Sequence, residues 1–479
     1  MNNSVSNDGT DFLYRQLAQD LGNAIRQGVY GIHERMPSLR RVTQHYGVSL
    51  ATALQAYQLL EDQGLLAARP KSGYYVLPRT SEPHPEPQTS QPPAHATAVN
   101  VGQLALSLVN ESRSPKLVRL GAAVPGADML PLKILSRNLA GIARRHWQDA
   151  GSYEAPQGVL ALRRQIARLM RQAGCQCTPE DIIVTNGCLE ALSLALRVVT
   201  KPGDSVAIES PTYFGILQVM ESLGLKAVEI ATHPSSGVDV AALQDAIAKN
   251  KLSACVLMPN HHNPLGSRMP DENKRQVVEM LAAANVPLIE DDVYGVLGYQ
   301  QPRPKAAKAY DRSDNVILCS SFSKTLAAGY RLGWLFSHRF HEAVEYHKFL
   351  ANISTATLPQ LAIAEFLSRG CYGRTIRQCA HTYRQRMEQL RFWISEYFPA
   401  GTRVSNPQGG FVLWVELPGE VDCVEVYRKA MDKRIAVSPG VLFGARAQYR
   451  HHIRLSCGAV EGDTMHKALK TLGGLIANK

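Results

Sequence analysis

The chain has 479 residues, of which 45% are hydrophobic and 19% charged, the composition of a folded protein with a sizeable core. Its length favours two or three domains, and its net charge of +11 permits nucleic-acid binding without locating the charge. No apolar run reaches membrane-spanning length, and nine scattered cysteines without a secretory leader favour a reducing cytoplasm. Cys175 and Cys177 have no second pair that would complete a zinc site, so no metal is expected.

The N-terminal part predicts three short helices. The first is amphipathic, because four apolar residues recur at a spacing of four: Leu13, Leu17, Leu21 and Ile25. A second helix is predicted over residues 39–45 and a third over 50–63, with a glycine turn at residues 46–48 and Ser49 as the cap. Two helices joined in this way form a helix-turn-helix, whose second helix enters the major groove of DNA.

The next segment, LLAARPKSGYYVLP, predicts two short strands around a turn that contains Gly73. Arg69 and Lys71 lie at the tip, where basic side chains can meet phosphates or a minor groove. The alternative interpretation of this unit is a three-helix bundle that binds another protein instead of DNA. The wing and the turn together favour DNA.

The unit resembles the GntR-type winged helix over nearly all its length, through the phrases LYRQLAQDL, MPSLRRV, YGVSLATALQAYQLLEDQGLL and RPKSGYYV. The resemblance implies DNA contacts by Arg40 and Thr52, beside the capping Ser49 and the basic wing. The family often has an arginine after the capping serine, where this chain has Leu50. A leucine cannot bind phosphate but can contact a thymine methyl group. The sequence of the DNA operator is therefore not predicted.

A proline-rich segment, TSEPHPEPQTSQPPAHATA, follows over residues 80–98. It has no bulky apolar side chain to bury, which predicts a semi-extended linker. The expected organisation is a winged helix over residues 1–79, a linker over 80–116 and a large domain over 117–479.

The large domain alternates amphipathic stretches with short runs rich in β-branched residues, among them DIIVTNG, DSVAIES, ACVLMPN, VPLIEDD and NVILCSS. This pattern predicts an α/β domain with a mainly parallel sheet covered by helices, followed by a small C-terminal α+β domain. Functional residues of such sheets lie at the carboxyl ends of the strands. Candidate residues stand at these ends in a fixed order: Gly187, Cys188, Tyr213, Asn263, Asp291, Tyr294, Ser321, Ser323, Lys324 and Arg331.

These motifs resemble the fold-type I, aspartate-aminotransferase-like proteins that bind pyridoxal 5'-phosphate, from about Leu117 to the C-terminus. The resemblance implies that Lys324, in SSFSKTLAAGYRLGW, forms an aldimine (a Schiff base) with the cofactor, and that Asp291 pairs with its ring nitrogen. It further implies the remaining contacts: Asn263 and Tyr294 hold the 3′-oxygen, Tyr213 stacks on the ring, and Gly187, Cys188, Ser321, Ser323 and Arg331 surround the phosphate.

Two more residues follow from the same resemblance. Tyr153 matches a tyrosine that reaches the phosphate in the neighbouring subunit, and Arg454, in IRLSC, matches the arginine that grips a ligand α-carboxylate. His261 and His262 suggest a metal at first sight, but adjacent residues of an extended segment point apart. They are expected to be structural or to line the ligand site.

The two halves together resemble the MocR/GabR class of bacterial regulators. The resemblance implies a cytoplasmic homodimer that binds promoter DNA and senses pyridoxal phosphate, or an amine or amino acid, through an aldimine. Efficient transamination is usually absent from this class. The alternative is an active aminotransferase that carries an accessory DNA-binding head, because a fold and a site do not by themselves certify turnover.

Overall fold

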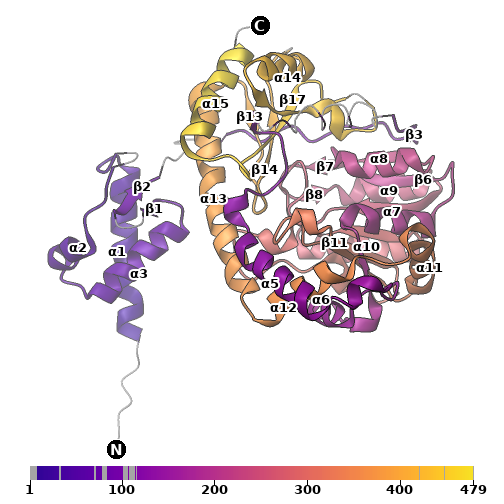
Figure 1. The fold of residues 1–479 in the computed structure, drawn as a ribbon. Helices are drawn as coiled ribbons and strands as arrows, with labels where there is room; N and C mark the ends of the chain where they lie inside the picture. Colours follow the sequence, from indigo (N-terminus) through magenta and orange to yellow (C-terminus); the bar gives the residue numbers. More distant parts are fainter. Residues whose placement is uncertain are drawn as a thin grey trace, which may run out of the picture. The chain divides into compact units, whose positions relative to one another are not determined.

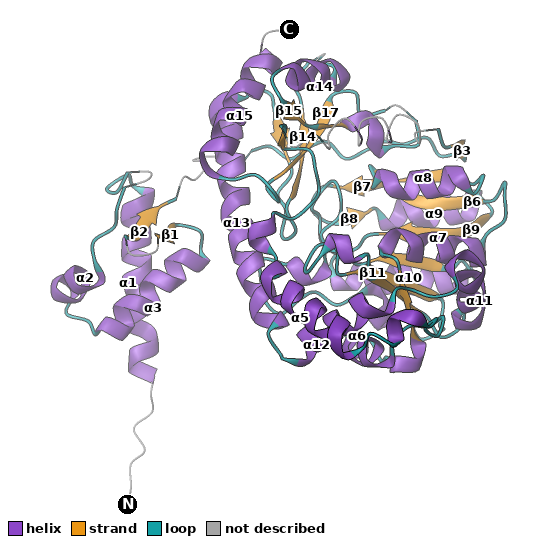
Figure 2. Cartoon of the chain, in the orientation of Figure 1, coloured by secondary structure: helices purple, strands orange, loops and turns teal. Residues whose placement is uncertain are grey.

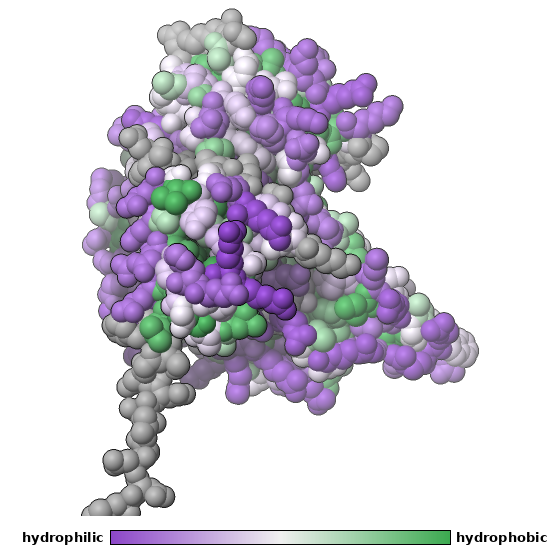
Figure 3. Space-filling view, turned by 90° about the vertical axis from the view of Figure 1, so that its left-hand side faces the viewer, coloured by the Kyte–Doolittle hydropathy of each residue, from purple (hydrophilic) through white to green (hydrophobic). Residues whose placement is uncertain are grey.

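A computed structural model describes residues 8–31, 34–69, 72–77, 84–100, 106, 110, 114, 116–419, 421–446 and 448–477. Two compact units are distinguished: residues 1–83 with 384–397, and residues 84–383 with 398–479 (Figure 1). No helix in these ranges is long and apolar enough to cross a membrane. Polar residues cover most of the face drawn in Figure 3, where hydrophobic side chains form small separate groups.

The N-terminal head is a winged helix-turn-helix, as the sequence predicts. Its elements are α1 (Asp8–Arg26), α2 (Leu39–Tyr46), α3 (Leu50–Asp62), β1 (Leu66–Arg69) and β2 (Gly73–Val76). The two strands pair in antiparallel fashion, with Arg69 opposite Gly73. The buried faces of the helices share one apolar core with the wing, in which Leu17, Leu21 and Tyr57 are almost fully buried.

Two serine caps set the angle between the helices of the head. Ser38 accepts a hydrogen bond from the amide of Arg41 at the start of α2, and Ser49 accepts one from the amide of Thr52 at the start of α3. Gly47 ends α2 with a φ of 64°, a left-handed conformation that glycine adopts without a steric cost. The hydroxyl of Tyr57 donates to the carbonyl oxygen of Pro37 at 2.8 Å, which fastens α3 to the α2 entry.

The large unit is built on a nine-stranded sheet (Figure 2). In spatial order its strands are β3 (Thr97–Ala98), β7 (Lys226–His233), β6 (Ser205–Ser210), β9 (Leu252–Leu257), β10 (Leu288–Asp291), β11 (Val316–Ser321), β12 (Gly333–Phe336) and β5 (Ile182–Thr185), and β8 (Gly237–Val238) pairs with β7. The central strands from β7 to β11 run parallel, whereas β12, β3 and β8 pair in antiparallel fashion. The prediction of a mainly parallel sheet is therefore confirmed.

Helices cover this sheet and bury its apolar strands. They are α5 (Leu132–Arg145), α6 (Leu160–Gln172), α7 (Cys188–Val199), α8 (Phe214–Ser222), α9 (Val240–Lys249), α10 (Asp271–Ala283), α11 (His341–Asn352) and α12 (Thr357–Ser368), and the long α13 (Tyr372–Tyr397) follows. Part of the core joins Val277 and Leu281 of α10 to Leu257 and Leu288 of the central strands. Burial of such side chains is the main term that stabilises the sheet.

A smaller antiparallel sheet follows α13 in the sequence. It consists of β13 (Arg403–Val404), β14 (Val412–Glu416), β17 (His452–Ser456) and β16 (Ser438–Pro439), in that order, with α14 (Cys423–Asp432) and α15 (Gly462–Ala477). A separate two-stranded ladder pairs β15 (Ile435–Ala436) with β4 (Val118–Arg119) in parallel. This ladder brings the segment after the linker beside the C-terminal sheet.

The described part of the proline-rich segment is extended, and its backbone is bound to the large unit. The carbonyl oxygen of Pro85 accepts a hydrogen bond from the amide of Val404, and the amide of Gln88 donates to Glu416. Further along, β3 adds a short strand to the edge of β7. The expected semi-extended conformation is present, and the segment is docked on both sheets over residues 85–98.

Candidate functional site

A cavity of about 510 Å³ opens at the carboxyl ends of the central strands. Nine of the predicted residues line it: Cys188, Tyr213, Asn263, Asp291, Tyr294, Ser321, Ser323, Lys324 and Arg331. They lie at or after the ends of five strands, β5, β6, β9, β10 and β11, which meet because these strands end at the same edge of the sheet. The predicted constellation is thus assembled in one place.

Lys324 lies in the turn that follows β11. The amides of Thr325 and Leu326 both donate to the carbonyl oxygen of Phe322, which closes the turn and directs Lys324 into the cavity. Its Nζ donates to the carbonyl oxygen of Ala123 at 2.7 Å. Burial, reinforced by the Arg454 guanidinium, lowers the pKa of Lys324 to about 8. A substantial fraction is therefore neutral near physiological pH, as a nucleophilic amine requires.

Asp291 is the last residue of β10 and is 2% exposed. Its Oδ1 accepts hydrogen bonds from the Val293 amide at 3.3 Å and from the Cys188 thiol at 3.5 Å. Burial raises the pKa of Asp291 to about 7. A carboxylate in such a place gains from a cationic partner, which would restore the charged form.

The N-terminus of α7 and Arg331 form one end of the cavity. Gly187 precedes the helix with a φ of 93° and without a side-chain cap, so the first amides of α7 are left for a ligand. The positive φ favours glycine at this position, and a Cβ atom there would lie 2.5 Å from Nη2 of Arg331. Arg331 donates to the carbonyl oxygen of Asn186 at 2.9 Å, and Ser321 ends β11 beside Ser323. This arrangement suits an anion such as a phosphate.

The opposite part of the cavity is aromatic and polar. The Tyr294 side chain is almost fully buried, and its hydroxyl has no hydrogen-bond partner among the residues that the structure describes. Burial raises the pKa of Tyr294. Tyr213 stands at the start of α8 and presents its ring to the cavity. Asn263 follows β9, and its Oδ1 accepts a hydrogen bond from Arg454.

Arg454 lies in β17 behind the cavity wall and is 3% exposed. Its guanidinium donates to Oδ1 of Asn263 at 3.0 Å and to the carbonyl oxygen of Gly121 at 2.5 Å, and it lies 5.0 Å from the centre of the Phe443 ring. Burial lowers the pKa of Arg454 to about 10. Its Nε has no partner within the described part of the chain. A buried guanidinium with an unused donor is suited to bind a carboxylate.

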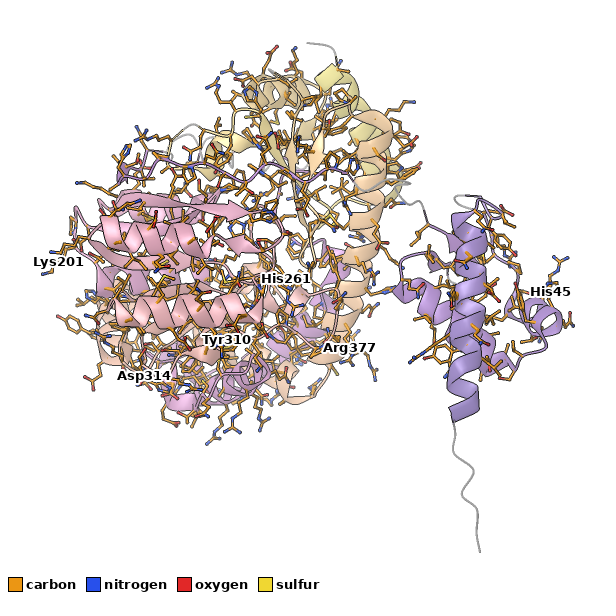
Figure 4. The ribbon with its side chains drawn as sticks, turned by 180° about the vertical axis from the view of Figure 1, so that it is seen from behind. His45, Lys201, His261, Tyr310, Asp314 and Arg377 are labelled. Carbon is orange, nitrogen blue, oxygen red and sulfur yellow. The ribbon has the colours of Figure 1, made fainter. Side chains whose placement is uncertain are left out.

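Three of the residues considered from the sequence lie away from this cavity. Tyr153 is 81% exposed and does not line it, so the expected contact with a neighbouring subunit stays a prediction. His261, which Figure 4 shows within the large unit, and His262 are both buried, and neither lines the cavity. His261 packs against Gly409, where a Cβ atom would lie 2.5 Å from its ring. Its role is therefore one of packing.

On the head, the residues expected to contact DNA differ in exposure. Arg40 and Ser49 are exposed, and Leu50 at the start of α3 is 57% exposed, as a contact with a base edge requires. Thr52 is only 7% exposed, and its hydroxyl lies 2.8 Å from the Ser49 hydroxyl. The Thr52 hydroxyl therefore supports the helix cap, and its expected contact with DNA stays a prediction.

The tip of the wing lies at the limit of what the structure describes. Lys71 falls outside the described residues, and for Arg69 the backbone is described but the side chain is not. Their expected DNA contacts stay predictions.

Several groups at the site could not be predicted from residue type or motif. The carbonyl oxygens of Gly121 and Ala123 accept hydrogen bonds from Arg454 and Lys324, and the hydroxyl of Ser438 accepts a further one from Arg454 at 3.2 Å. Two of these acceptors are main-chain carbonyl oxygens, which every residue has, so residue type does not indicate them. The segment GAAVPG and the isolated Ser438 carry no recognisable motif.

The described residues fit pyridoxal 5'-phosphate. The uncapped α7 N-terminus with Arg331 accommodates a phosphate, and Asp291 lies where it can meet a ring nitrogen. The orphaned Tyr294 hydroxyl can donate to a ring oxygen, while Lys324 supplies the amine. Each requirement of the cofactor thus has a matching group in the cavity.

Comparison with known proteins supports the assignment of both the N-terminal head and the large unit. Residues 134–472 match the family model "Aminotransferase class I and II", and residues 13–76 match "Bacterial regulatory proteins, gntR family". Among solved structures, a Pyrococcus horikoshii kynurenine aminotransferase is 26% identical with a TM-score of 0.73, and the match covers 78% of this chain and 94% of that one.

Two relatives span nearly the whole length. The chain is 38% identical to the Escherichia coli protein described as uncharacterized HTH-type transcriptional regulator YjiR, over 97% of this chain and 98% of that protein. It is 35% identical to the similarly described YdcR of the same organism, over 97% of this chain and 99% of that protein. The chain therefore belongs to the HTH-type regulators of MocR-type architecture, which join a GntR-family head to an aminotransferase class I and II domain.

Proposed function

We propose that the chain is a DNA-binding transcriptional regulator whose large unit holds pyridoxal 5'-phosphate and senses it, or an amine or amino acid that reacts with it. The observation that carries this proposal is the coexistence of a capped recognition helix with a cavity that fits the cofactor. Relatives that cover both parts and are described as transcriptional regulators support it.

When bound, the cofactor supplies an aldehyde that combines with amines and a ring that withdraws electrons. The remaining chemistry belongs to the chain. Lys324 supplies a partly neutral amine, Asp291 compensates a positive ring nitrogen, and Arg331 with the α7 amides binds the phosphate. Arg454 binds the α-carboxylate of an amino acid through its bidentate guanidinium.

The linker offers a route from this cavity to the head. Ser90 bonds to the end of β6, and Gln88 bonds to Glu416 of β14, so the segment contacts both sheets. A ligand that changes how these sheets pack would alter the strain on the linker. Such a ligand changes DNA affinity only by its differential affinity for the two arrangements.

We also propose that two chains form a homodimer through the large unit. On α11 the side chains of Tyr346, Phe349 and Leu350 lie on one face and are 62%, 49% and 62% exposed. Exposed apolar groups of this size are typical of protein interfaces. A dimer carries two heads, whose spacing would match two half-sites of a promoter operator. A protein that binds promoter DNA in this way would act in the cytoplasm.

Footprinting on the promoter of its own gene and of adjacent genes tests the regulator. A protected site whose occupancy changes with pyridoxal phosphate or an amino acid is expected, and absence of protection under every ligand condition contradicts the proposal. An active aminotransferase would instead convert donor and acceptor well beyond one equivalent per site in the steady state. That result would make regulation secondary.

Visible absorbance of the purified protein tests the cofactor separately. Lys324→Ala should abolish the absorbance of the covalently held cofactor, because alanine has no amine to form the bond. The control is Lys201→Ala, since Lys201 is an exposed lysine at the edge of the large unit (Figure 4). An unchanged spectrum in Lys324→Ala would contradict the assignment of Lys324.

A further inference from the structure

Arg119 is the charged cavity residue that the roles given above do not use. It lines the cavity and is exposed, as the last residue of β4. No hydrogen bond or ion pair joins its side chain to another residue within the described ranges. An arginine that faces a cavity without an internal partner has its donors available for a ligand.

The strand register places Arg119 next to Arg454 along one wall. Arg119 pairs with Ala436 in the β4–β15 ladder, and two residues later Ser438 pairs with Arg454 in the β16–β17 ladder. Two residues of extended chain span about 7 Å. Because Arg119 is exposed while Arg454 is buried, Arg119 stands one step nearer the cavity mouth.

The same short segment also contacts the two groups that would hold an amino acid. Its Gly121 carbonyl accepts from Arg454, and its Ala123 carbonyl accepts from Lys324. The Arg119 side chain therefore belongs to the piece of chain that borders the ligand position. It lies within reach of a side chain that extends from an amino acid held at Arg454.

The charges at the cavity then indicate which side chain fits. Asp291, Lys324 and Arg331 face the cofactor, and Arg454 takes the α-carboxylate. Arg119 is the charged lining residue of the described chain that remains for the rest of the ligand. A carboxylate can accept two parallel hydrogen bonds from its guanidinium, whereas a basic side chain would be repelled.

We propose that Arg119 determines ligand specificity by binding a second carboxylate, so that the effector is an acidic amino acid. The proposal rests on the proposed function, because it assumes an amino acid held at Arg454. It names the chemical class of that ligand: an amino acid whose side-chain carboxylate lies two or three carbon atoms from the α-carbon.

Glutamate and glutamine form the first pair of probes, because they share a shape and differ in charge. Titration of the cofactor-loaded protein, followed by visible absorbance and by calorimetry, should give about tenfold tighter binding of glutamate. Arg119→Gln should weaken glutamate about tenfold and change glutamine less than twofold, with Arg119→Lys between. Lys116→Gln, a neighbouring exposed lysine, is the charge-matched control.

Glutarate and butyrate form the second pair, because neither carries an amine that reacts with the cofactor. Calorimetry with and without added pyridoxal phosphate should show that the dicarboxylate binds more tightly and loses this preference in Arg119→Gln. Failure to load the cofactor would contradict the proposed function and leave the glutarate result readable. Equal binding within each pair, an equal effect of Arg119→Gln on both members, or no binding of any probe would overturn the role of Arg119.

Discussion

Ser90 of the proline-rich segment donates a hydrogen bond from its Oγ to the carbonyl oxygen of Ser210, the last residue of β6. The same Oγ accepts one from the amide of Thr232 in β7. The hydroxyl of Ser210 in turn donates to Oε1 of Glu229 at 2.9 Å, which also accepts from Gln448 at 2.7 Å. The linker is thus joined to the buried end of the large sheet and, through Glu229, to the C-terminal part of the chain.

This network comes close to the cavity wall at one place and to the buried Arg454 at another. Ser210 is three residues before Tyr213 of the cavity wall, and the amide of Ala445, which donates to Glu229, is two residues after Phe443. Phe443 packs against the Arg454 guanidinium. A rearrangement at either place would therefore reach Ser90 through a few hydrogen bonds.

Ser90→Ala should reduce the effect of ligand on DNA affinity. A loss of about 1 kcal/mol of coupling, the typical worth of one hydrogen bond, would shrink the ratio of the dissociation constants with and without ligand by about fivefold. Cofactor absorbance should not change, since Ser90 does not line the cavity. Ser368→Ala, which removes only a local hydrogen bond within α12, is the control, and an unaltered ratio in Ser90→Ala would reject the route.

Asp291→Asn should stabilise the cofactor-free protein at pH 8. The pKa of Asp291 is raised to about 7, so between pH 4 and 7 the folded state binds more protons than the unfolded state. Stability is therefore lost as pH rises through this window, and asparagine removes the loss, which is on the order of 2–4 kcal/mol. Urea unfolding at pH 8 and below pH 4 should show the gain only at pH 8.

Asp422→Asn supplies a control of opposite sign. Despite the opposing effect of burial, hydrogen bonds from the Val424 amide and Arg450 hold the pKa of Asp422 below its usual value. That substitution should therefore destabilise the protein at pH 8. Asp291→Asn should also weaken cofactor binding, and a variant that gained affinity for pyridoxal phosphate would exclude the proposed pairing.

Much of the site could be predicted because the sheet pattern fixes where strands end. Asp291 and Ser321 are the last residues of β10 and β11, and the apolar runs before them were sufficient to locate both ends. Likewise, Ser49 was identifiable as a cap, since its residue type and its position before an apolar pattern agree. These predictions depend on side-chain type and periodicity, which a sequence shows directly.

Other features depend on main-chain atoms and on tertiary packing. The carbonyls of Gly121 and Ala123 accept hydrogen bonds from Arg454 and Lys324 because β4 pairs with β15. Each of these strands has only two residues, which is too short a pattern to predict a long-range pairing. The composition of the proline-rich segment predicts an extended chain, but not the backbone groups to which Ser90 bonds. The burial of Thr52 likewise follows from helix packing in the head and not from its position in the motif.

Arg454→Gln should weaken the binding of every amino acid and leave the cofactor in place. The guanidinium bonds to Asn263 and to the Gly121 carbonyl and has an unused Nε, whereas glutamine has no charge to offer a carboxylate. Glutamate and alanine should both lose at least tenfold in affinity by calorimetry. Arg450→Gln removes an exposed guanidinium paired with Asp422 and should change neither. Loss of alanine binding in that control would show a structural effect.

Arg40→Ala should weaken binding to every DNA sequence by a similar factor. Arg40 is exposed on α2, the first helix of the motif, where its charge can meet a phosphate. In a plot of the logarithm of the DNA association constant against the logarithm of the salt concentration, the slope should become less steep by about one unit per head, because one fewer counterion is released. Lys249→Ala, on the surface of the large unit and paired with Asp245, removes one charge and should leave the slope unchanged. A lower slope in Lys249→Ala as well would trace the effect to net charge, whereas a change in sequence preference in Arg40→Ala would assign Arg40 to a base edge.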